Sequence, residues 1–275
     1  MNKNKAYIGF KYMLFILLTA FLVFPLYWII STAFRSNTEI LSSNVSLIPK
    51  SFTLEHFKVL FVDIDILNCM KNSLTITLFT VFISVFVGAL MAYILERYVF
   101  KGRNTIQNMI LFTQFVPMVS YIIPLYLIMS KLGLLNTYAS LIITYLGVAL
   151  PVGVVMLVNF IKDVPIALEE AARIDGCTNL QIMLKIVLPL SVSGIISTSI
   201  YIFITIWQEY LVAVSFITRE SAYTVSLALT KFQGAHGTDW GGIMAGAVFI
   251  SIPTLALFVC FRKLFTDRLS GGVKG

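Results

Sequence analysis

The sequence predicts an all-α membrane protein with six transmembrane helices, and two observations carry the prediction. Of its 275 residues, 58% are hydrophobic and only 12% are charged, with a mean hydropathy of +0.90. Soluble domains carry about a quarter charged residues. Uncharged runs of roughly the 20 residues needed to cross a bilayer occur six times, and no strand alternation typical of a membrane barrel competes with them. The runs are residues 12–34, 72–95, 104–130, 132–161, 186–208 and 240–261.

Four of the runs have ends that bear on the number and length of the spans. The first run follows lysines and resembles a signal peptide, but it is 23 residues long and lacks a small-residue cleavage site after a short core. We therefore expect a retained anchor. The third and fourth runs are separated only by Lys131 and a turn expected around Gly133 and Asn136. The fifth run can continue past Glu209 to Phe216, so the sequence defines the outer boundary of this span only to within one or two helical turns.

The loop charges predict the orientation of the chain. With the amino terminus in the cytoplasm, thirteen basic and six acidic residues lie inside, and seven of each lie outside. The whole net charge of +7 then lies on the cytoplasmic side, as the positive-inside rule expects. Both termini are expected in the cytoplasm. The lipid bilayer explains the positive charge, and no nucleic-acid partner is needed.

Two outer segments are long enough to hold structure of their own. Residues 36–70 mix charged and apolar side chains and are expected to include a short surface helix. Residues 219–239 contain the glycine-rich stretch 233–237, which predicts a turn before the last span.

Prolines interrupt the later spans. A proline in a lipid-embedded helix frees backbone carbonyls that neighbouring helices or a water-filled path must satisfy. A translocation path and tolerated kinks explain any single proline about equally well. The prolines are Pro117, Pro124, Pro151, Pro189 and Pro253.

The cytoplasmic segment 162–189 is expected to form two short helices joined by a hinge. Asp163 followed by Pro165 is typical of a helix start. Gly176 predicts the end of that helix, because glycine readily takes the left-handed conformation. Thr178 and Gln181 form a capping-box pattern that starts the second helix. Apolar residues then recur at i, i+3, i+4 and i+7 and predict one stripe. They are Leu180, Met183, Leu184 and Val187.

The first short helix suits either a partner protein or a simple connection. Arg173 follows Glu169 by four residues and Glu170 by three, which supports a helix. The pair Ala171-Ala172 allows close approach of another surface. Asp175 lies at the carboxyl end of the helix, where an acid is disfavoured by roughly a few tenths of a kcal/mol, and a docked partner would offset this cost. An interfacial hairpin that only connects two spans fits the same residues about as well.

The spacing of this segment resembles the cytoplasmic motif of permease subunits of bacterial ABC importers. That motif is matched by Glu170-Ala171-Ala172, Gly176, Ile186 and Leu188-Pro189, with every position filled. The resemblance extends along nearly the whole chain to the maltose-type carbohydrate permeases. Further matches are Pro25-Leu26-Tyr27-Trp28, Asn72-Ser73-Leu74, Trp207-Gln208-Glu209, Gly237-Thr238-Asp239-Trp240 and Gly271-Gly272-Val273-Lys274-Gly275. The chain departs at Cys177, where alanine is more usual, and at Gln208, where asparagine is common.

The resemblance implies the type I ABC importer permease fold, with a cytoplasmic coupling hairpin that fits a cleft on an ATPase subunit. The implied ATPase-coupling residues are Glu169, Glu170, Ala171, Ala172, Arg173, Asp175 and Gly176. The implied domains are an amino-terminal helix with its outer segment (1–70), the transmembrane domain with five helices and the coupling loop (71–265), and a cytoplasmic tail (266–275).

The resemblance also implies partners. They are a second homologous permease subunit, a cytoplasmic ABC ATPase dimer and an extracellular solute-binding protein, assembled at the bacterial cell membrane. No cofactor is expected in this chain, because it has no Gly-rich Walker loop. ATP and Mg²⁺ are expected on the partner ATPase. The implied solute is a sugar or a sugar-like molecule, and its contact residues stay unassigned, although Tyr121, Tyr126 and Tyr145 are aromatic side chains that can stack on a sugar.

Two other classes of function compete. An ion-driven transporter or channel usually carries ionisable residues deep inside its spans, whereas here only Glu209 lies close to one, with Trp207 expected to anchor the same outer boundary. A membrane-embedded enzyme needs a constellation of reactive groups. His56 and His236 have no partner at suitable spacing and are expected in solvated loops. The three cysteines, Cys69, Cys177 and Cys260, are too dispersed for a disulfide framework or a zinc site.

Overall fold

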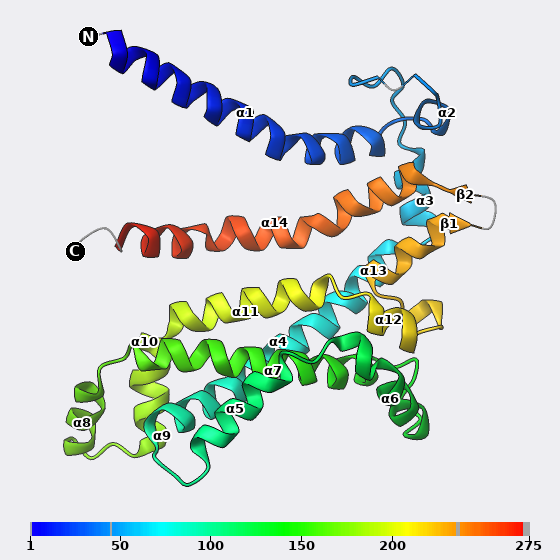
Figure 1. Cartoon of the computed structure of the whole chain (residues 1–275). Coiled ribbons are helices and arrows are strands. Elements are labelled where there is room, and N and C mark those ends of the chain that lie inside the picture. Colours follow the sequence, from blue (N-terminus) through cyan, green and yellow to red (C-terminus); the bar gives the residue numbers. More distant parts are fainter. Residues whose placement is uncertain (1, 45, 235–236, 272–275) are drawn as a thin grey trace. The chain divides into compact units, whose positions relative to one another are not determined.

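The computed structural model describes residues 2–44, 46–234 and 237–271, and most of these residues are helical (Figure 1). Among them, four helices are long and apolar enough to cross a membrane. Two bent helix pairs raise the number to six when each pair counts as one span. The prediction of an all-α membrane protein is confirmed. The four long helices are α1 (Asn2–Ala33), α4 (Ile66–Arg97), α7 (Tyr138–Lys162) and α14 (Trp240–Gly271).

The third predicted span is not one continuous helix. α5 (Arg103–Thr113) and α6 (Met118–Lys131) meet at 96° across the break at residues 114–117. Pro117 is extended, with ψ 132°, directly before α6. Proline cannot donate the hydrogen bond that continues a helix, and it steers the preceding residue away from helical geometry. Pro117 therefore marks the break, in agreement with the interruption by proline expected for the span at residues 104–130.

The fifth span is bent close to its predicted start. α9 (Asn179–Ile182), the π-helical turn η1 (Met183–Val187) and α10 (Leu188–Leu190) follow one another, and together they meet α11 (Val192–Trp207) at 74°. A π-turn and a proline are both recognised causes of helix bending, and Pro189 lies in α10. The start predicted at residue 186 therefore falls inside the first helix of the bent pair, and the bend follows directly after Pro189.

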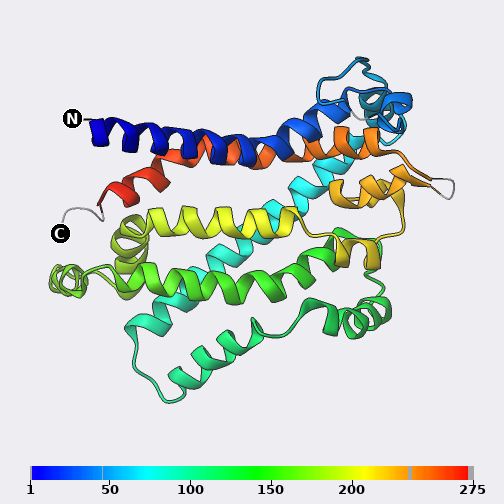
Figure 2. The ribbon, with the colours of Figure 1, turned by 45° about the horizontal axis from the view of Figure 1, so that its top comes forward.

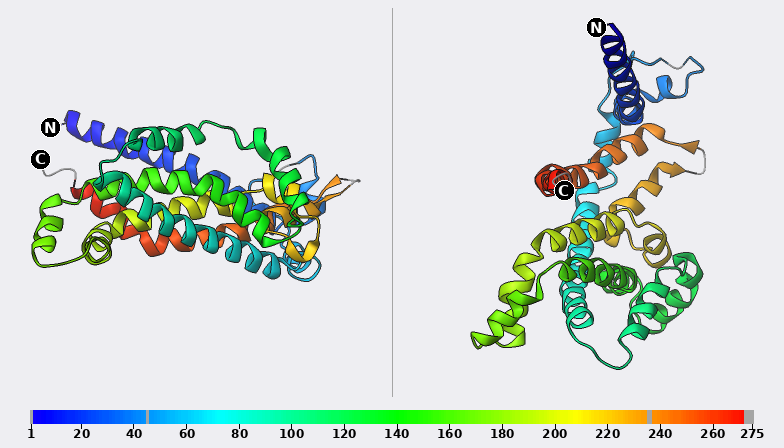
Figure 3. Two further views of the ribbon diagram at one scale, coloured as in Figure 1. Left: turned by 90° about the horizontal axis from the view of Figure 1, so that it is seen from below. Right: turned by 60° about the vertical axis from the view of Figure 1, so that its left-hand side comes forward.

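The chain divides into two compact units. The core unit comprises residues 68–227 and 256–275, and the amino-terminal unit comprises residues 1–67 and 228–255. In the core unit α7 and α11 lie side by side (Figure 2), and α8 and α9 lie at one end of these helices (Figures 1 and 3). Close packing is made possible by glycine: Gly88 of α4 faces the backbone of Gly153 in α7. Buried side chains of this unit include Ile76, Leu141, Tyr145, Ile202 and Phe216.

The amino-terminal unit contains α1 and two short helices, α2 (Asn37–Ile40) and α3 (Glu55–Val62). The short helix expected within residues 36–70 is confirmed by α3. The predicted turn at 233–237 is a two-stranded hairpin in which Gln233 of β1 (Gln233–Gly234) pairs with Thr238 of β2 (Gly237–Thr238). His236 lies outside the described residues.

The remaining short elements of the chain are α12 (Leu211–Phe216), η2 (Glu220–Ala222), α13 (Val225–Ala228) and η3 (Leu229–Phe232).

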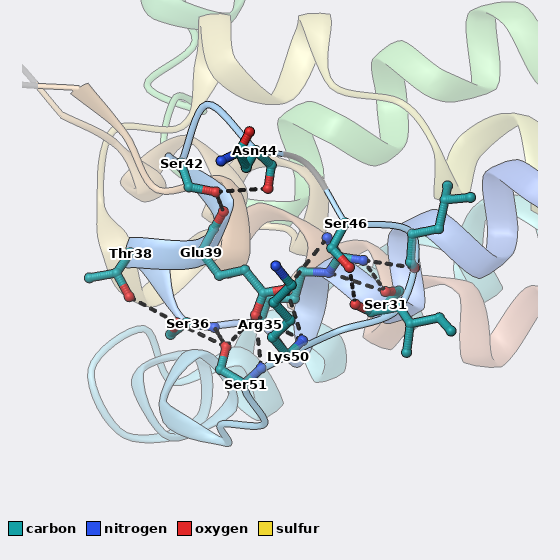
Figure 4. Close-up of polar contacts among 12 residues, drawn as sticks. Ser31, Arg35, Ser36, Thr38, Glu39, Ser42, Asn44, Ser46, Lys50 and Ser51 are labelled. Carbon is teal, nitrogen blue, oxygen red and sulfur yellow. Dashed lines mark hydrogen bonds and ion pairs between the residues drawn. The ribbon is translucent and has the colours of Figure 1, made fainter.

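A polar cluster holds the segment after α1 in place (Figure 4). Arg35 is buried, and its Nη2 donates to Ser31 Oγ at 3.0 Å and to the Leu47 carbonyl at 3.0 Å. The Glu39 carboxylate accepts from the Ser51 hydroxyl at 2.6 Å and from the Lys50 amide at 3.0 Å. The cluster therefore ties residues 36–51 back onto the end of α1.

His56 is buried, so its predicted place in a solvated loop is wrong. It lies on α3, where Nε2 is 2.9 Å from the Arg35 carbonyl and Nδ1 is 3.6 Å from the Asp239 carboxylate. Gly241 of α14 leaves the room for this ring, because a β-carbon there would lie 2.1 Å from the imidazole. The sequence offers no local signal for this burial, since the three contacts come from distant segments.

The last helix extends beyond the apolar run that predicted it. α14 starts at Trp240, as the run does, and continues to Gly271. The tail predicted for residues 266–275 therefore begins inside a helix, and residues 272–275 lie outside the described residues. The division at residues 70 and 265 stays a prediction.

Candidate functional site

The hairpin between α7 and α10 begins with α8 (Ile166–Ile174). Pro165 is its N-cap residue, with an extended backbone, whereas Asp163 is the C-cap residue of α7. The predicted capping of this helix by Asp163 is therefore wrong. The physical reason is Pro165, because the residue before a proline is kept out of helical geometry and the helix cannot start earlier.

Gly176 ends α8 as predicted. Its φ is +85°, in the left-handed region. The Cys177 amide donates to the Ala172 carbonyl at 2.9 Å, and the Gly176 amide donates to the Arg173 carbonyl at 3.1 Å. These two bonds are the Schellman pattern, which satisfies carbonyls that a helix end otherwise leaves open. The turn at Gly176 is thus a defined structure.

The second helix also starts as predicted. The Thr178 hydroxyl accepts from the Gln181 amide at 3.3 Å, and the Gln181 side chain accepts from the Thr178 amide at 2.8 Å, which completes the capping box. The predicted apolar residues lie on one side of the segment: Leu180, Met183 and Leu184 line one pocket, and Met183 and Val187 are buried. The segment passes through the π-helical turn η1 without losing this arrangement.

The inner face of α8 is fixed to two other helices through Glu169. Its side chain is 2% exposed, and its Oε1 lies 2.6 Å from Arg97 Nε at the end of α4. Arg97 Nη2 donates to the carbonyls of Ile161 and Val164, at 2.8 Å each. The Tyr93 hydroxyl donates to Glu169 Oε2 at 3.2 Å. Glu169 therefore pairs with Arg97, rather than with Arg173 on its own helix.

The outer face of α8 is uncovered in the described part of the chain. Its exposed charged residues are accompanied by apolar ones, of which Ile174 is 87% exposed. A surface that combines large apolar side chains with charges is typical of a site for another molecule. The exposed residues of α8 and of the turn that follows it are Ile166, Ala167, Leu168, Glu170, Ala171, Arg173, Ile174, Asp175 and Gly176.

A second feature of the core unit is a cavity at the break between α5 and α6. It has a volume of about 370 Å³. Gln114 and Pro117 come from the break, Tyr121 from α6, Pro151 from α7 and Tyr201 from α11. The other two tyrosines that can stack on a sugar lie elsewhere. Tyr126 packs edge-on against Phe216, and Tyr145 is buried.

Glu209 stabilises the break in the chain between α11 and α12 by accepting hydrogen bonds. Its Oε1 accepts from the Val212 amide at 2.8 Å, and its Oε2 accepts from the Tyr145 hydroxyl at 2.6 Å. A carboxylate at the start of α12 satisfies amides that a helix leaves open. Trp207 is buried and stacks on Phe203, so its predicted role as a boundary anchor is wrong.

Comparison with known proteins identifies the family. Residues 84–271 match the family described as the binding-protein-dependent transport system inner membrane component. The chain belongs to this family. It is a permease subunit of a binding-protein-dependent ABC importer, and as such an inner-membrane transport subunit rather than an enzyme.

Relatives and solved structures agree with this identification. The permease is 35% identical over 255 residues to the diacetylchitobiose uptake system permease protein DasC of Streptomyces coelicolor, over 92% of each chain. It is 32% identical over 260 residues to the trehalose/maltose transport system permease protein MalG of Thermococcus litoralis, over 94% of this chain and 93% of that one.

Among solved structures, a bacterial ABC transporter involved in the import of the acidic polysaccharide alginate matches the permease with a TM-score of 0.80 at 20% identity. The match covers 96% of this chain and 98% of the other. The predicted ABC importer permease fold is confirmed.

The permease hairpin brings its predicted site residues to two different faces. Glu169 and Ala172 face their own chain, and the other five are exposed. Arg97 and Tyr93 were missed by sequence reasoning, because they lie about 70 residues before the hairpin. The sequence marks Arg97 only as a basic residue just beyond the second uncharged run, which does not indicate a contact with the hairpin.

Proposed function

We propose that this permease imports a sugar or oligosaccharide and that the outer face of α8 docks a cytoplasmic ATPase. The uncovered face of α8 carries the docking proposal. Five of the seven predicted coupling residues are exposed on α8 or directly after it, and the turn at Gly176 gives the helix a defined end. Glu170 supplies the charged contact.

The sugar proposal rests on the relatives and on the cavity at the α5–α6 break. The relatives are permeases named for diacetylchitobiose and for trehalose or maltose. The cavity combines the aromatic rings of Tyr121 and Tyr201 with the amide of Gln114. Aromatic faces and a few placed polar groups are the usual means of binding small polar ligands.

The assembly follows from the family. One six-span permease forms half of a pore, so a second homologous permease completes it, with two ATPase subunits inside and a solute-binding protein outside. ATP and Mg²⁺ belong to the ATPase. The excess of basic residues on one side supports a cytoplasmic position for α8 and both termini.

The test is uptake by the complete importer in proteoliposomes, with the binding protein outside and ATP inside. A panel of trehalose, maltose and diacetylchitobiose is supplied, with glutamate and methionine as unrelated solutes. We expect uptake of at least one sugar, dependence on ATP and insensitivity to a protonophore. Uptake that needs an ion gradient and ignores ATP would instead indicate an ion-driven transporter. Uptake of none of the sugars would contradict the sugar proposal.

Docking is tested by a matched pair of charge changes. Glu170→Lys alters the outer face of α8, whereas Asp163→Lys alters an exposed acid just before the helix. We expect Glu170→Lys to lose ATP-driven uptake and co-purification of the ATPase. Asp163→Lys keeps both. Equal behaviour of the two variants would remove the docking assignment.

A further inference from the structure

We propose that Arg97 and Glu169 form a fixed joint through which movement of α8 reaches α4 and α7. The proposal rests on the proposed docking of an ATPase at α8. It separates Glu169 from the five exposed coupling residues: Glu169 does not touch the ATPase but transmits its movement. Arg97 and Glu169 are positioning residues of the transport cycle.

The contacts of Arg97 join three elements at one point. Arg97 Nε binds Glu169 Oε1 of α8 at 2.6 Å. Arg97 Nη2 binds the Ile161 carbonyl of α7 and the Val164 carbonyl of the connection, each at 2.8 Å. Arg97 itself is the last residue of α4. The planar guanidinium can serve all three acceptors at once, which the single ammonium of a lysine cannot do in the same geometry.

Burial makes this contact rigid. The Arg97 side chain is 6% exposed and that of Glu169 is 2% exposed. A buried charge without its partner is strongly unfavourable, so neither side chain can leave without the other. The Tyr93 hydroxyl donates a hydrogen bond to Glu169 Oε2, the second carboxylate oxygen, and so limits rotation of the carboxylate.

The geometry of the loop explains why a joint is needed. Only residues 163–165 connect α7 to α8, and only residues 175–178 connect α8 to α9. Without the joint, Ala172 would be the one buried residue of α8 that packs against α4 and α7 in the described part of the chain, and a force on α8 would bend these connections more easily. With the joint, a displacement of α8 is passed directly to the ends of α4 and α7.

The experiment replaces the pair by apolar residues of similar size. The double variant Arg97→Met/Glu169→Leu removes the charges together, so no unpaired charge is left. The matched control is Glu96→Leu/Arg103→Met. That pair also lies near the end of α4, with an ion-pair distance of 3.6 Å, but it does not reach α8. Both variants are assembled in the complete importer and reconstituted with its binding protein.

The readout is the number of solute molecules transported per ATP hydrolysed, together with co-purification of the ATPase. We expect the Arg97/Glu169 variant to retain the ATPase and to lose at least tenfold in this ratio, and the control to stay within twofold. A normal ratio would overturn the proposal. Loss of ATPase co-purification would also overturn it, because the pair would then act in docking.

If the double variant does not fold, a conservative variant tests the same proposal. Arg97→Lys keeps the charge and loses the simultaneous contacts, so we expect a ratio between wild type and the double variant. An unchanged ratio would overturn the joint. Failure of the docking proposal is recognised separately, because Glu170→Lys would then keep its ATPase whatever the ratio of the Arg97 variants.

Discussion

The backbone of Gly194 on α11 lies against the ring of Phe160 on α7, so closely that a β-carbon at Gly194 would stand 2.1 Å from the ring's Cγ. Real side-chain contacts do not approach this distance. The close pairing of α7 and α11 therefore depends on the absence of a side chain at this position, and it joins the helix before the hairpin to the helix after it.

We predict that Gly194→Ala destabilises the permease by about 1–3 kcal/mol, the usual cost of overpacking. When Phe160 is already alanine, Gly194→Ala should cost at least about 1 kcal/mol less, because the atoms that clash are absent. Thermal unfolding in detergent, analysed as a double-mutant cycle, measures both values. Gly147→Ala is the control, since nothing lies within 4 Å of its added β-carbon. Additive effects of the two alanines would contradict the contact.

The turn after α8 gives a second prediction. An added side chain at Gly176 meets no atom within 4 Å, so the effect of a substitution comes only from its φ of +85°. Valine at a left-handed position costs roughly 1–2 kcal/mol, whereas asparagine tolerates it. We expect Gly176→Val to lose ATP-driven uptake and Gly176→Asn to keep most of it. Equal loss in both variants would show that uptake depends on the small size of glycine rather than on its backbone freedom.

Glu39 provides a pH-dependent prediction. The Ser51 hydroxyl, followed by the Lys50 amide, lowers the pKa of Glu39 from its ordinary 4.5 to about 2. Because the folded pKa is the lower one, the carboxylate stabilises residues 36–51 above pH 4.5, and this contribution is lost as the pH falls toward 2.

Hydrogen exchange of residues 36–51, corrected for the intrinsic rate at each pH, measures this effect. We expect protection to fall between pH 4.5 and 2 in the wild type. In Glu39→Gln, protection should be weaker at pH 6 and should change little over the same interval. A parallel fall in both proteins would assign the loss to other groups. Glu55→Gln is the control, because this exposed acid belongs to α3 and takes no part in the cluster.

Local signals in the sequence predicted the elements that local physics controls. Gly176 and the Thr178–Gln181 box end and start helices through bonds within a few residues, so their pattern is visible in the chain. The run at residues 240–261 predicted the start of α14 for the same reason, since apolar length alone sets a span.

The bends and the buried polar groups could not be predicted in this way. Pro117 and Pro151 both lie inside predicted spans, yet only Pro117 coincides with a sharp break, while α7 continues through Pro151. Neighbouring helices decide this outcome. Likewise, His56 and Glu169 are polar residues of exposed-looking segments, and their burial depends on partners 21 and 72 residues away.

Glu209 gives the last prediction and separates an ATP-driven importer from an ion-driven transporter. Its carboxylate caps α12 and accepts from Tyr145. Glutamine keeps an acceptor for the Val212 amide, and its NH₂ group can donate to the tyrosine oxygen. We therefore expect Glu209→Gln to cost less than about 1 kcal/mol, and Glu209→Ala, which removes the cap, to cost about 1–2 kcal/mol. Uptake in proteoliposomes with ATP inside and a protonophore present should stay within twofold of wild type for Glu209→Gln. Thermal unfolding provides the matching stability. If Glu209→Gln unfolds normally but loses uptake, the ionisable carboxylate itself takes part in transport, and ion coupling becomes the better explanation.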